Sequence, residues 1–169
     1  MSNFISHSFS RGFTLIEVVV VIVIISILVG LGGATYINQQ EHATATTRVA
    51  RAKTIATALE QYYSRNGEYP GVGIVAQTSA TNVSTILRID KKDIVDPTAA
   101  TGTNSIVNYE NYSSSTATVF RYRGYAANLT TCRTSTTTGY CEAFILSYRD
   151  TLTNQWKEIR SVQGQSLLP

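Results

Sequence analysis

The sequence predicts an α+β protein in which a long N-terminal helix, membrane-spanning in its first half, packs on a small antiparallel β-sheet. Three observations predict this fold class: an apolar run from Phe13 to Ile37, an amphipathic pattern that continues to Asn66-Gly67, and alternation of apolar and polar residues in the last third. A chain of 169 residues has room for one domain and an anchor, but not for two independent cores.

The N-terminal apolar run is long enough to cross a membrane. As a helix, its roughly 25 residues would span about 37 Å, against a hydrocarbon core of about 30 Å. An ordinary secretory signal would have a shorter apolar region that ends at a cleavage site of small residues. Arg11 precedes the run, and no basic cluster follows Ile37 directly. This asymmetry predicts that the N-terminus is cytoplasmic and that the rest of the chain lies outside.

Glu17 interrupts the apolar run one helical turn after Phe13. A carboxylate inside a membrane is costly unless it reaches the surface or meets a cation. Two interpretations are therefore open. In the first, Glu17 lies near the membrane surface, stays hydrated and has no role; in the second, it meets a positive group supplied by another chain.

The residues Arg11-Gly12-Phe13-Thr14-Leu15-Ile16-Glu17, followed by a Val/Ile run, resemble the class III signal of bacterial type IV pilins and pseudopilins. The resemblance implies that a prepilin peptidase cleaves the Gly12-Phe13 bond and methylates the new N-terminal residue, Phe13. It also implies that Glu17 meets the N-terminal amine of a neighbouring subunit during filament assembly. Such a pair would set the register of the subunits more than it would add stability.

The resemblance also implies a domain organisation. We expect a cytoplasmic leader over 1–12, a transmembrane and filament-core helix over 13–37, the amphipathic half of the same helix over 38–66, and an extracellular head over 67–169. The implied function is that of a structural subunit of a type IV pilus, which is anchored in the cytoplasmic membrane before assembly and extracellular afterwards. Its implied partners are copies of itself, prepilin peptidase, the pilus assembly machinery and other pilins.

Two alternatives to this function remain open. The same fold would suit a minor pilin or pseudopilin of a DNA-uptake, adhesion or type II secretion system. A membrane-anchored domain that never polymerises would instead retain residues 1–12.

The second half of the helix is expected to pack on the head. Its apolar stripe recurs at spacings of three and four, and the charged side chains of this half are expected to lie largely off it. The helix should end at Asn66-Gly67, because Tyr69-Pro70 prevents its continuation. The stripe comprises Val49, Ala52, Ile55 or Ala56, Leu59, and Tyr62 or Tyr63; the charged residues are Arg48, Arg51, Lys53, Glu60 and Arg65.

Residues 71–112 give weaker signals. The sequence favours a short helix over Val83–Ile89 and an end to local structure at Asp96-Pro97, with exposed loops over Thr98–Ser105 and Ser113–Thr118. Asp90, Asp93 and Asp96 recur at every third position, which raises the question of a calcium site. The intervening Lys91 and Lys92, and the lack of an EF-hand pattern, favour a solvated run of charges.

The last third predicts three strands, over Thr118–Ala126, Glu142–Tyr148 and Trp156–Val162. In the first, Phe120 and Tyr122 share a face; in the second, Phe144, Leu146 and Tyr148 do. Three antiparallel strands cannot bury both faces of their sheet unaided. We therefore expect the amphipathic half of the helix to cover one of the two faces.

Cys132 and Cys141 flank a Thr-rich turn before the second of these strands. Outside the cytoplasm, such an isolated pair favours a disulfide, which would stabilise the fold by about 2–3 kcal/mol in the loop-entropy model. Free thiols are the alternative if oxidative folding is lacking. A C-terminal disulfide loop also resembles that of many pilins.

No enzymatic motif is found. Two cysteines and two histidines do not suit a Cys/His zinc site, and phosphate-loop and dinucleotide patterns are missing from the sequence. Outside the first residues, His42 is the one histidine, and it lies on the predicted helix. We therefore expect no catalysis, no metal and no cofactor.

Basic and aromatic residues are interleaved in the strand region. They could bind a nucleic-acid backbone, but a net charge of only +3 favours ordinary solvated arginines. The residues are Arg121, Arg123, Arg133, Arg149, Lys157 and Arg160, among Tyr122, Tyr125, Tyr148 and Trp156.

Overall fold

The computed structural model describes residues 12–76, 80–99, 106–108, 119–132 and 140–169, without the side chains of 31–38 and Asn108. The chain forms two compact units, Met1–Gln40 and Glu41–Pro169. The loops predicted over Thr98–Ser105 and Ser113–Thr118 lie largely outside the described residues.

A single helix, α1 (Leu15–Asn66), has residues in both units. Its length of 52 residues confirms the predicted long helix, and its end confirms the predicted stop at Asn66-Gly67. The Gly67 N–H donates to the Tyr63 carbonyl oxygen at 2.7 Å, and Gly67 has a φ of +77°. Glycine adopts this left-handed conformation without the steric cost that other residues incur, so the helix ends here.

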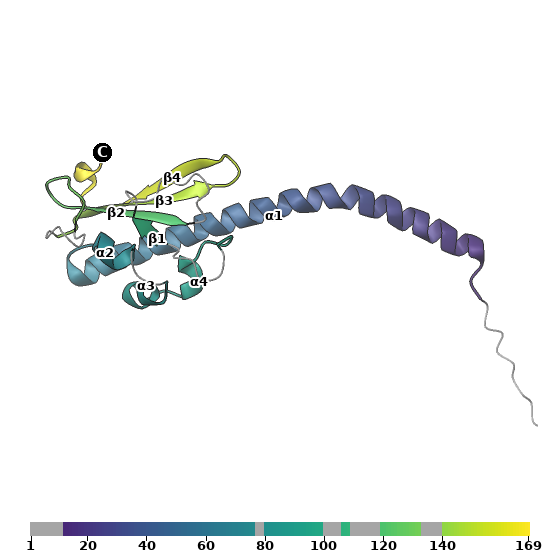
Figure 1. Cartoon of the computed structure of the whole chain (residues 1–169), viewed down its shortest axis with the longest axis horizontal. Helices are drawn as coiled ribbons and strands as arrows, with labels where there is room; N and C mark the ends of the chain where they lie inside the picture. Colours follow the sequence, from purple (N-terminus) through teal and green to yellow (C-terminus); the bar gives the residue numbers. More distant parts are fainter. Residues whose placement is uncertain (1–11, 77–79, 100–105, 109–118, 133–139) are drawn as a thin grey trace, which may run out of the picture. The chain divides into compact units, whose positions relative to one another are not determined.

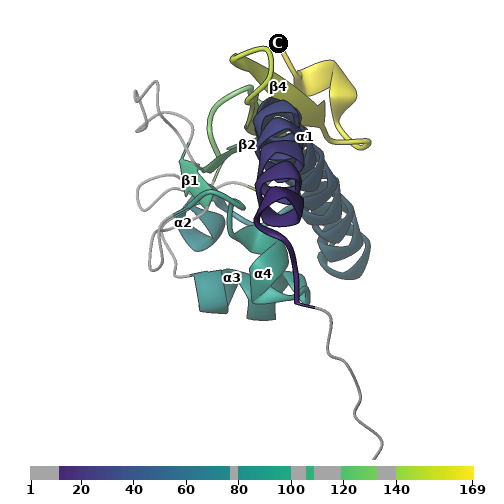
Figure 2. The same ribbon diagram turned by 90° about the vertical axis from the view of Figure 1, so that its right-hand side faces the viewer.

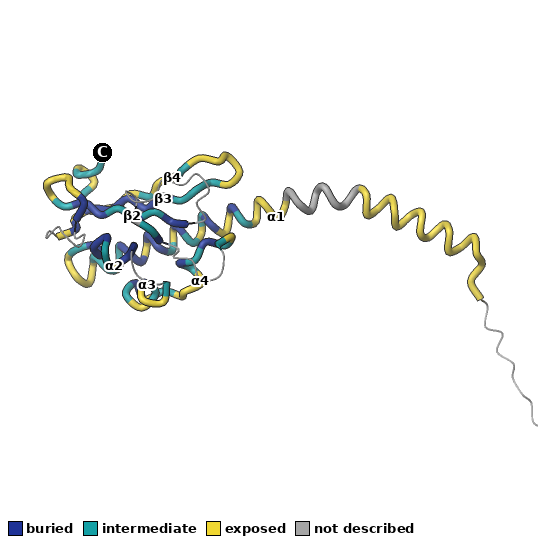
Figure 3. Tube along the Cα trace, in the orientation of Figure 1, coloured by how far each residue is buried: buried dark blue, intermediate teal, exposed yellow. Residues whose placement is uncertain are grey.

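The first unit exposes its apolar side chains on every side of the helix. From Phe13 to Val29 all large apolar residues are exposed, as Figure 3 shows along the first part of α1. Within the described residues, no helix combines the length and the apolar character needed to cross a membrane. The structure therefore does not confirm the membrane-spanning helix predicted over 13–37. The side chains of residues 31–37 lie outside the described part of the chain.

The second unit contains the head, which combines four strands with short helices. In both Figure 1 and Figure 2, β4 lies at one end of this unit and α3 and α4 lie at the other, with β1 and β2 between them. The elements are α2 (Val72–Val75), α3 (Ala80–Leu87), α4 (Lys91–Ile94), β1 (Ile106–Asn108), β2 (Phe120–Tyr125), β3 (Ala143–Asp150), β4 (Gln155–Arg160) and the 3-10 turn η1 (Gln165–Leu167).

The sheet has the order β1-β2-β3-β4 and is mixed. The three predicted strands correspond to β2, β3 and β4, which pair antiparallel, but β1 pairs parallel to β2. The prediction of a purely antiparallel sheet is therefore wrong. β1 has only three residues, too few to show the two-residue alternation by which strands are recognised in a sequence.

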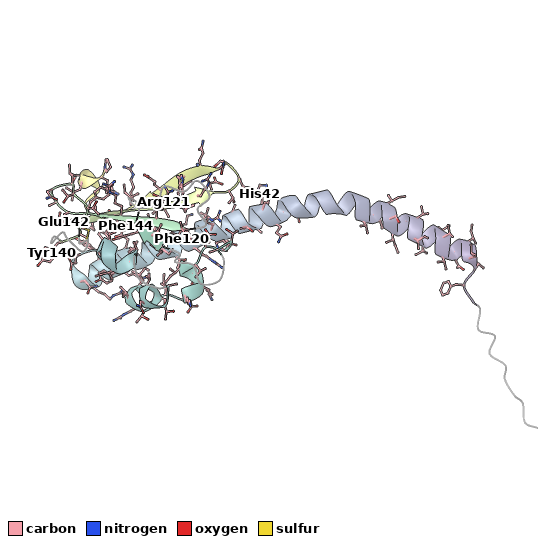
Figure 4. All side chains as sticks on the ribbon, viewed as in Figure 1. His42, Phe120, Arg121, Tyr140, Glu142 and Phe144 are labelled. Carbon is pink, nitrogen blue, oxygen red and sulfur yellow. A yellow bond between two sulfur atoms is a disulfide. The ribbon has the colours of Figure 1, made fainter. Side chains whose placement is uncertain are left out.

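The inner face of the sheet packs against α1. Tyr122, Phe144 and Leu146 belong to the same buried cluster as Ile55 and Leu59 of α1, which confirms that the amphipathic half of the helix covers this face. Figure 4 labels Phe144, together with Phe120 and Arg121, on the sheet. Hydrophobic burial of this kind is what holds a helix on a small sheet.

The outer face is covered in part by the C-terminal segment. Tyr125, Ala143 and Ile145 form a second buried cluster, against which Leu167 and Leu168 pack. As a result β3 is buried on both faces from Ala143 to Ser147. This second layer was not predicted from the strand pattern.

Arg48 is buried, and the prediction that it lies off the packed stripe of α1 is wrong. Its side chain is 3% exposed, and Nε and Nη2 donate to the two carboxylate oxygens of Asp96 at 2.5 and 2.7 Å. Arg48 also donates to the Thr98 hydroxyl and to the Arg149 carbonyl oxygen. It therefore joins α1 to the segment after α4 and to β3 through charge-assisted hydrogen bonds.

Glu60, also expected off the stripe, forms a second link from α1. Its carboxylate accepts hydrogen bonds from the Tyr69 hydroxyl at 2.7 Å and from the Val162 N–H at 2.8 Å. Burial, followed by the hydrogen bond and negative charge of Glu60, raises the pKa of Tyr69 far above its ordinary value of 10.0. Tyr69 is therefore a neutral donor throughout the physiological pH range.

Cys132 and Cys141 form the predicted disulfide. Residues 133–139, which the disulfide loop contains, lie outside the described residues. Gly124 of β2 lies directly against the bridge, since a Cβ atom built on it would be 2.5 Å from the Cys132 Sγ. That separation is far below van der Waals contact, so only glycine fits there without movement of the bridge.

We expect Gly124→Ala to destabilise the head by about 1–3 kcal/mol, because a methyl group must displace the bridge or the strand. Thermal unfolding of the oxidised protein measures the effect. Ala126, two residues further along the chain and half-buried, provides a control, since Ala126→Gly should cost about 1 kcal/mol or less. Equal stability of Gly124→Ala and wild type would show that the bridge moves freely.

Candidate functional site

The Gly12-Phe13 bond lies in an exposed segment just before α1. Residues 12–14 have no regular structure, and the helix begins at Leu15. Phe13 is 85% exposed, and no atom lies within 4 Å of a Cβ built on Gly12. The Gly12-Phe13 bond is therefore exposed at the surface; residues 1–11 lie outside the described part of the chain.

Glu17 lies in the first turn of α1 and caps the helix together with Thr14. The Thr14 N–H and hydroxyl each donate to Glu17 Oε2 at 3.2 Å, and the Glu17 N–H donates back to the Thr14 hydroxyl oxygen at 3.3 Å. This reciprocal pair is a capping box, which satisfies two N–H groups that the helix itself leaves without partners. A negative side chain at this end also interacts favourably with the helix dipole.

The capping box was not predicted, although the sequence contains its signature. Thr14 and Glu17 have the spacing S/T-x-x-E that precedes an apolar helical run. The box fixes the position of the Glu17 carboxylate before any other chain is present. Both hydrogen bonds from Thr14 end on Oε2, and within the described residues Oε1 accepts none. Oε1 therefore remains available to a cation.

The surroundings of Glu17 are apolar and exposed. The neighbouring Ile16 and Val18 are 68% and 51% exposed, and Glu17 is the one charged residue between Phe13 and Val29. A helix that is apolar all round is typical of one that becomes buried in a membrane or among other helices. A carboxylate buried there needs a compensating positive charge.

Two of the three aspartates considered for a cation, Asp90 and Asp96, have side-chain partners within the head. Asp96 binds Arg48 and Thr98, and Asp90 lies 3.1 Å from the Lys92 ammonium group. Within the described residues, no group of three Asp, Glu, His or Cys side chains is arranged to hold a metal ion. The structure therefore does not bring Asp90, Asp93 and Asp96 together as a set of ligands.

Four arginines of the strand region, Arg121, Arg123, Arg149 and Arg160, lie on the outer face of the sheet, whereas Arg133 lies outside the described residues. The strand register places Arg121 opposite Ser147 and Arg123 opposite Ile145, which lies next to Arg160 of β4. The Arg121 guanidinium lies 3.6 Å from the centre of the Trp156 ring, and that of Arg123 lies 5.0 Å from the centre of the Tyr125 ring. These are cation–π distances.

The N-terminal geometry agrees with the comparison to known families. Residues 8–33 match the model of the prokaryotic N-terminal methylation motif. No curated protein and no solved structure matches the chain. The matched region contains the exposed Gly12-Phe13 bond, the capping box and the start of the apolar helix. Residues 8–33 therefore carry the prokaryotic N-terminal methylation motif, which is the class III signal peptide of type IV pilins.

Proposed function

We propose that this protein is a structural, non-catalytic pilin, cleaved between Gly12 and Phe13, methylated at Phe13 and assembled into a type IV pilus through its N-terminal helix. The observation that carries the proposal is the exposed apolar surface from Phe13 to Val29, which directly follows the processing signal and contains Glu17 as its one charge. In a filament, neighbouring copies of the helix would cover this surface.

Cleavage would give Phe13 a positively charged amine close to Glu17 of another subunit. The capping box supports this role, because it holds the carboxylate in place by Oε2 and leaves Oε1 available. In an apolar filament core, the amine and the carboxylate would each be unfavourable alone and favourable as a pair. Pairing between staggered subunits would thus select one register.

Before assembly, we propose that the apolar sequence from Phe13 to Ile37 anchors the prepilin in the cytoplasmic membrane. Its N-terminus would be cytoplasmic, because Arg11 precedes the run. The head would then fold outside, where oxidising conditions allow the Cys132–Cys141 bridge.

Intact-mass and N-terminal peptide analysis of sheared surface material tests the proposal. We expect the chain to begin at methylated Phe13 and to be abundant in the filament fraction. The matched comparison is the membrane fraction of a strain without prepilin peptidase, where residues 1–12 should be retained. An intact leader in surface filaments would contradict the processing that we propose.

The amount of processed protein separates the major pilin from the alternative roles. A minor pilin or pseudopilin of a DNA-uptake, adhesion or secretion system would begin at the same residue but be scarce in sheared material. Quantification against total filament protein therefore decides between them.

A further inference from the structure

We propose that the turn between β3 and β4 of one copy of the chain inserts Leu152 into a pocket at the opposite end of the head of a second copy. The turn, here called the hairpin tip, comprises residues 151–154. The inference rests on the proposed filament, to which it adds a contact between heads. The pocket, here called the end pocket, has a volume of about 350 Å³ and is lined mainly by Arg123, Tyr125, Leu129, Leu167, Leu168 and Pro169.

The hairpin tip holds Leu152 in a fixed position. The N–H groups of Leu152 and Thr153 donate to Asp150 Oδ1 at 3.0 and 3.4 Å. On the other side of the tip, Arg149 Nε donates to Asn154 Oδ1 at 2.9 Å. Leu152 is 48% exposed, and Figure 3 shows the exposed turn between β3 and β4. An apolar side chain on a turn that is already ordered loses little conformational entropy when it is buried by a partner.

Leu129 of the end pocket has an unusual conformation for its residue type. Its φ is +65°, in the left-handed region that glycine adopts readily and a leucine rarely does. Two hydrogen bonds of 2.9 Å, from the Ala126 N–H to the Thr130 carbonyl oxygen and from the Leu129 N–H to the Ala126 carbonyl oxygen, maintain this turn. The Leu129 side chain is nevertheless 59% exposed. A leucine that is unfavourable in both backbone and exposure points to a contact that buries it.

The hairpin tip and the end pocket are complementary in polarity and in charge. Most of the residues that line the pocket are apolar, which suits a leucine side chain. Among these lining residues Arg123 is the one with a charged side chain, and Asp150 is the one charged residue in 150–155. The two charges are opposite, so they favour the approach of one end to the other.

The tip and the pocket lie at opposite ends of β3. Tyr125 of the pocket pairs with Ala143, the first residue of β3, whereas the tip follows Asp150, its last residue. Seven steps along a strand separate the two ends by roughly 23 Å. In Figure 1 the turn between β3 and β4 and the C-terminus accordingly lie at opposite ends of the head. The tip therefore cannot fill the pocket of its own chain.

The direction of β3 gives this contact the symmetry of a filament. Arg48 of α1 donates to the Arg149 carbonyl oxygen near the tip, and Tyr69, just after α1, donates its N–H to the Cys141 carbonyl oxygen near the start of β3. β3 thus runs opposite to the second half of α1, with the tip at one end of the head and the pocket at the other. A contact between two different ends of identical subunits does not close on itself and repeats from copy to copy.

Cysteine cross-linking in sheared filaments tests the proposal. We expect Leu129→Cys/Leu152→Cys filaments to give a ladder of multimers on a non-reducing gel after mild oxidation. A bond within one chain is excluded, because a disulfide needs Cα atoms within about 7 Å. Cys132 and Cys141 are buried in their own bridge and do not compete.

The matched control is Leu129→Cys/Val162→Cys, together with the two single variants. Val162 is an exposed apolar residue that does not line the pocket, so these proteins should give no ladder. Leu129→Cys should also react readily with a thiol reagent in detergent-solubilised monomers and be protected in filaments.

A second measurement replaces cross-linking if the double variant does not assemble. Leu152→Ala should shorten the lifetime of heated filaments about tenfold, because each contact loses much of the burial of one leucine. Val162→Ala should leave the lifetime at the wild-type value.

The results separate this contact from the proposed filament. Lack of wild-type filaments would overturn both. Wild-type filaments, with no ladder from an assembled Leu129→Cys/Leu152→Cys or with a wild-type lifetime for Leu152→Ala, would overturn the contact alone. An equal ladder from the Val162 control would do the same, since it would show indiscriminate cross-linking. Protection of Leu129→Cys already in monomers would mean that a small molecule or the chain itself occupies the pocket, and would likewise overturn the contact.

Discussion

Glu17→Gln is expected to reduce filament yield at least tenfold, although it preserves the helix cap. Glutamine can replace glutamate in a capping box, so the bond from the Thr14 N–H should persist. What the variant loses is the negative charge that we propose pairs with the Phe13 amine of a neighbouring subunit. Filaments sheared from cells that express only the variant, quantified against total pilin, measure the effect.

Thr14→Ala is the matched control, because it weakens the cap and keeps the charge. The lost hydroxyl should cost about 1 kcal/mol of helix stability, as for other N-cap residues, and filaments should still form. Wild-type filament yield from Glu17→Gln would refute the charge pair. Loss of filaments in Thr14→Ala, with normal yield in Glu17→Gln, would instead assign the role of this turn to capping.

Features with a regular period were the most predictable from the sequence. The apolar run, the stripe on the second half of α1 and the alternation in β2 and β3 each repeat over several residues, so tertiary context is not needed to detect them. The stop at Gly67 and the Cys132–Cys141 pair were predictable for a different reason, since few residue types have so specific a local chemistry.

The unpredicted features depend on partners that are distant in the sequence. Arg48 lies 48 residues from Asp96, and nothing in the helical pattern distinguishes it from the exposed Lys53. Arg48 continues the three-and-four spacing of the buried Ala45, Ala52 and Ile55, but its charge predicts an exposed position. β1 similarly takes its place in the sheet by pairing with β2, the one strand it pairs with among the described residues.

The candidate site likewise has some features that local sequence predicts and others that depend on distant residues. Gly12, Phe13 and Glu17 were predicted from the sequence because the processing signal is local and specific. The capping box was equally local and could have been found from Thr14 and Glu17. The placement of Arg121, Arg123 and Arg160 on one side of the sheet, in contrast, follows from the strand register, which the sequence pattern of a single strand does not give.

Asp96→Asn is expected to lower the free energy of unfolding of the head by about 3–5 kcal/mol, because it leaves the buried Arg48 guanidinium without a counter-charge. Denaturant unfolding of the full chain in neutral detergent, followed by the fluorescence of Trp156, measures the loss. Asp90→Asn makes the same chemical change in an exposed pair with Lys92, and should cost about 1 kcal/mol or less.

A double-variant cycle separates the ion pair from other effects of the substitution. Arg48→Met removes the cation and leaves the Asp96 carboxylate buried, so it should be about as destabilising as Asp96→Asn. Arg48→Met/Asp96→Asn should lose less than the sum of the two, because neither charge then remains unpaired. Strict additivity would show that the two side chains contribute independently.

The same pair predicts the acid sensitivity of the head. Burial alone would raise the pKa of Asp96, but hydrogen bonds from Arg48 and Thr98 and the charge of Arg48 outweigh it and hold the pKa below its ordinary value of 3.8. A depressed pKa contributes stability that is fully present above 3.8 and is lost as the pH falls through the lower, folded-state value. Below about pH 4, the unfolding midpoint of the wild type should therefore fall more steeply with decreasing pH than the midpoint of Asp96→Asn. Parallel pH profiles for the two proteins would contradict this, since they would place the acid-labile groups elsewhere in the head.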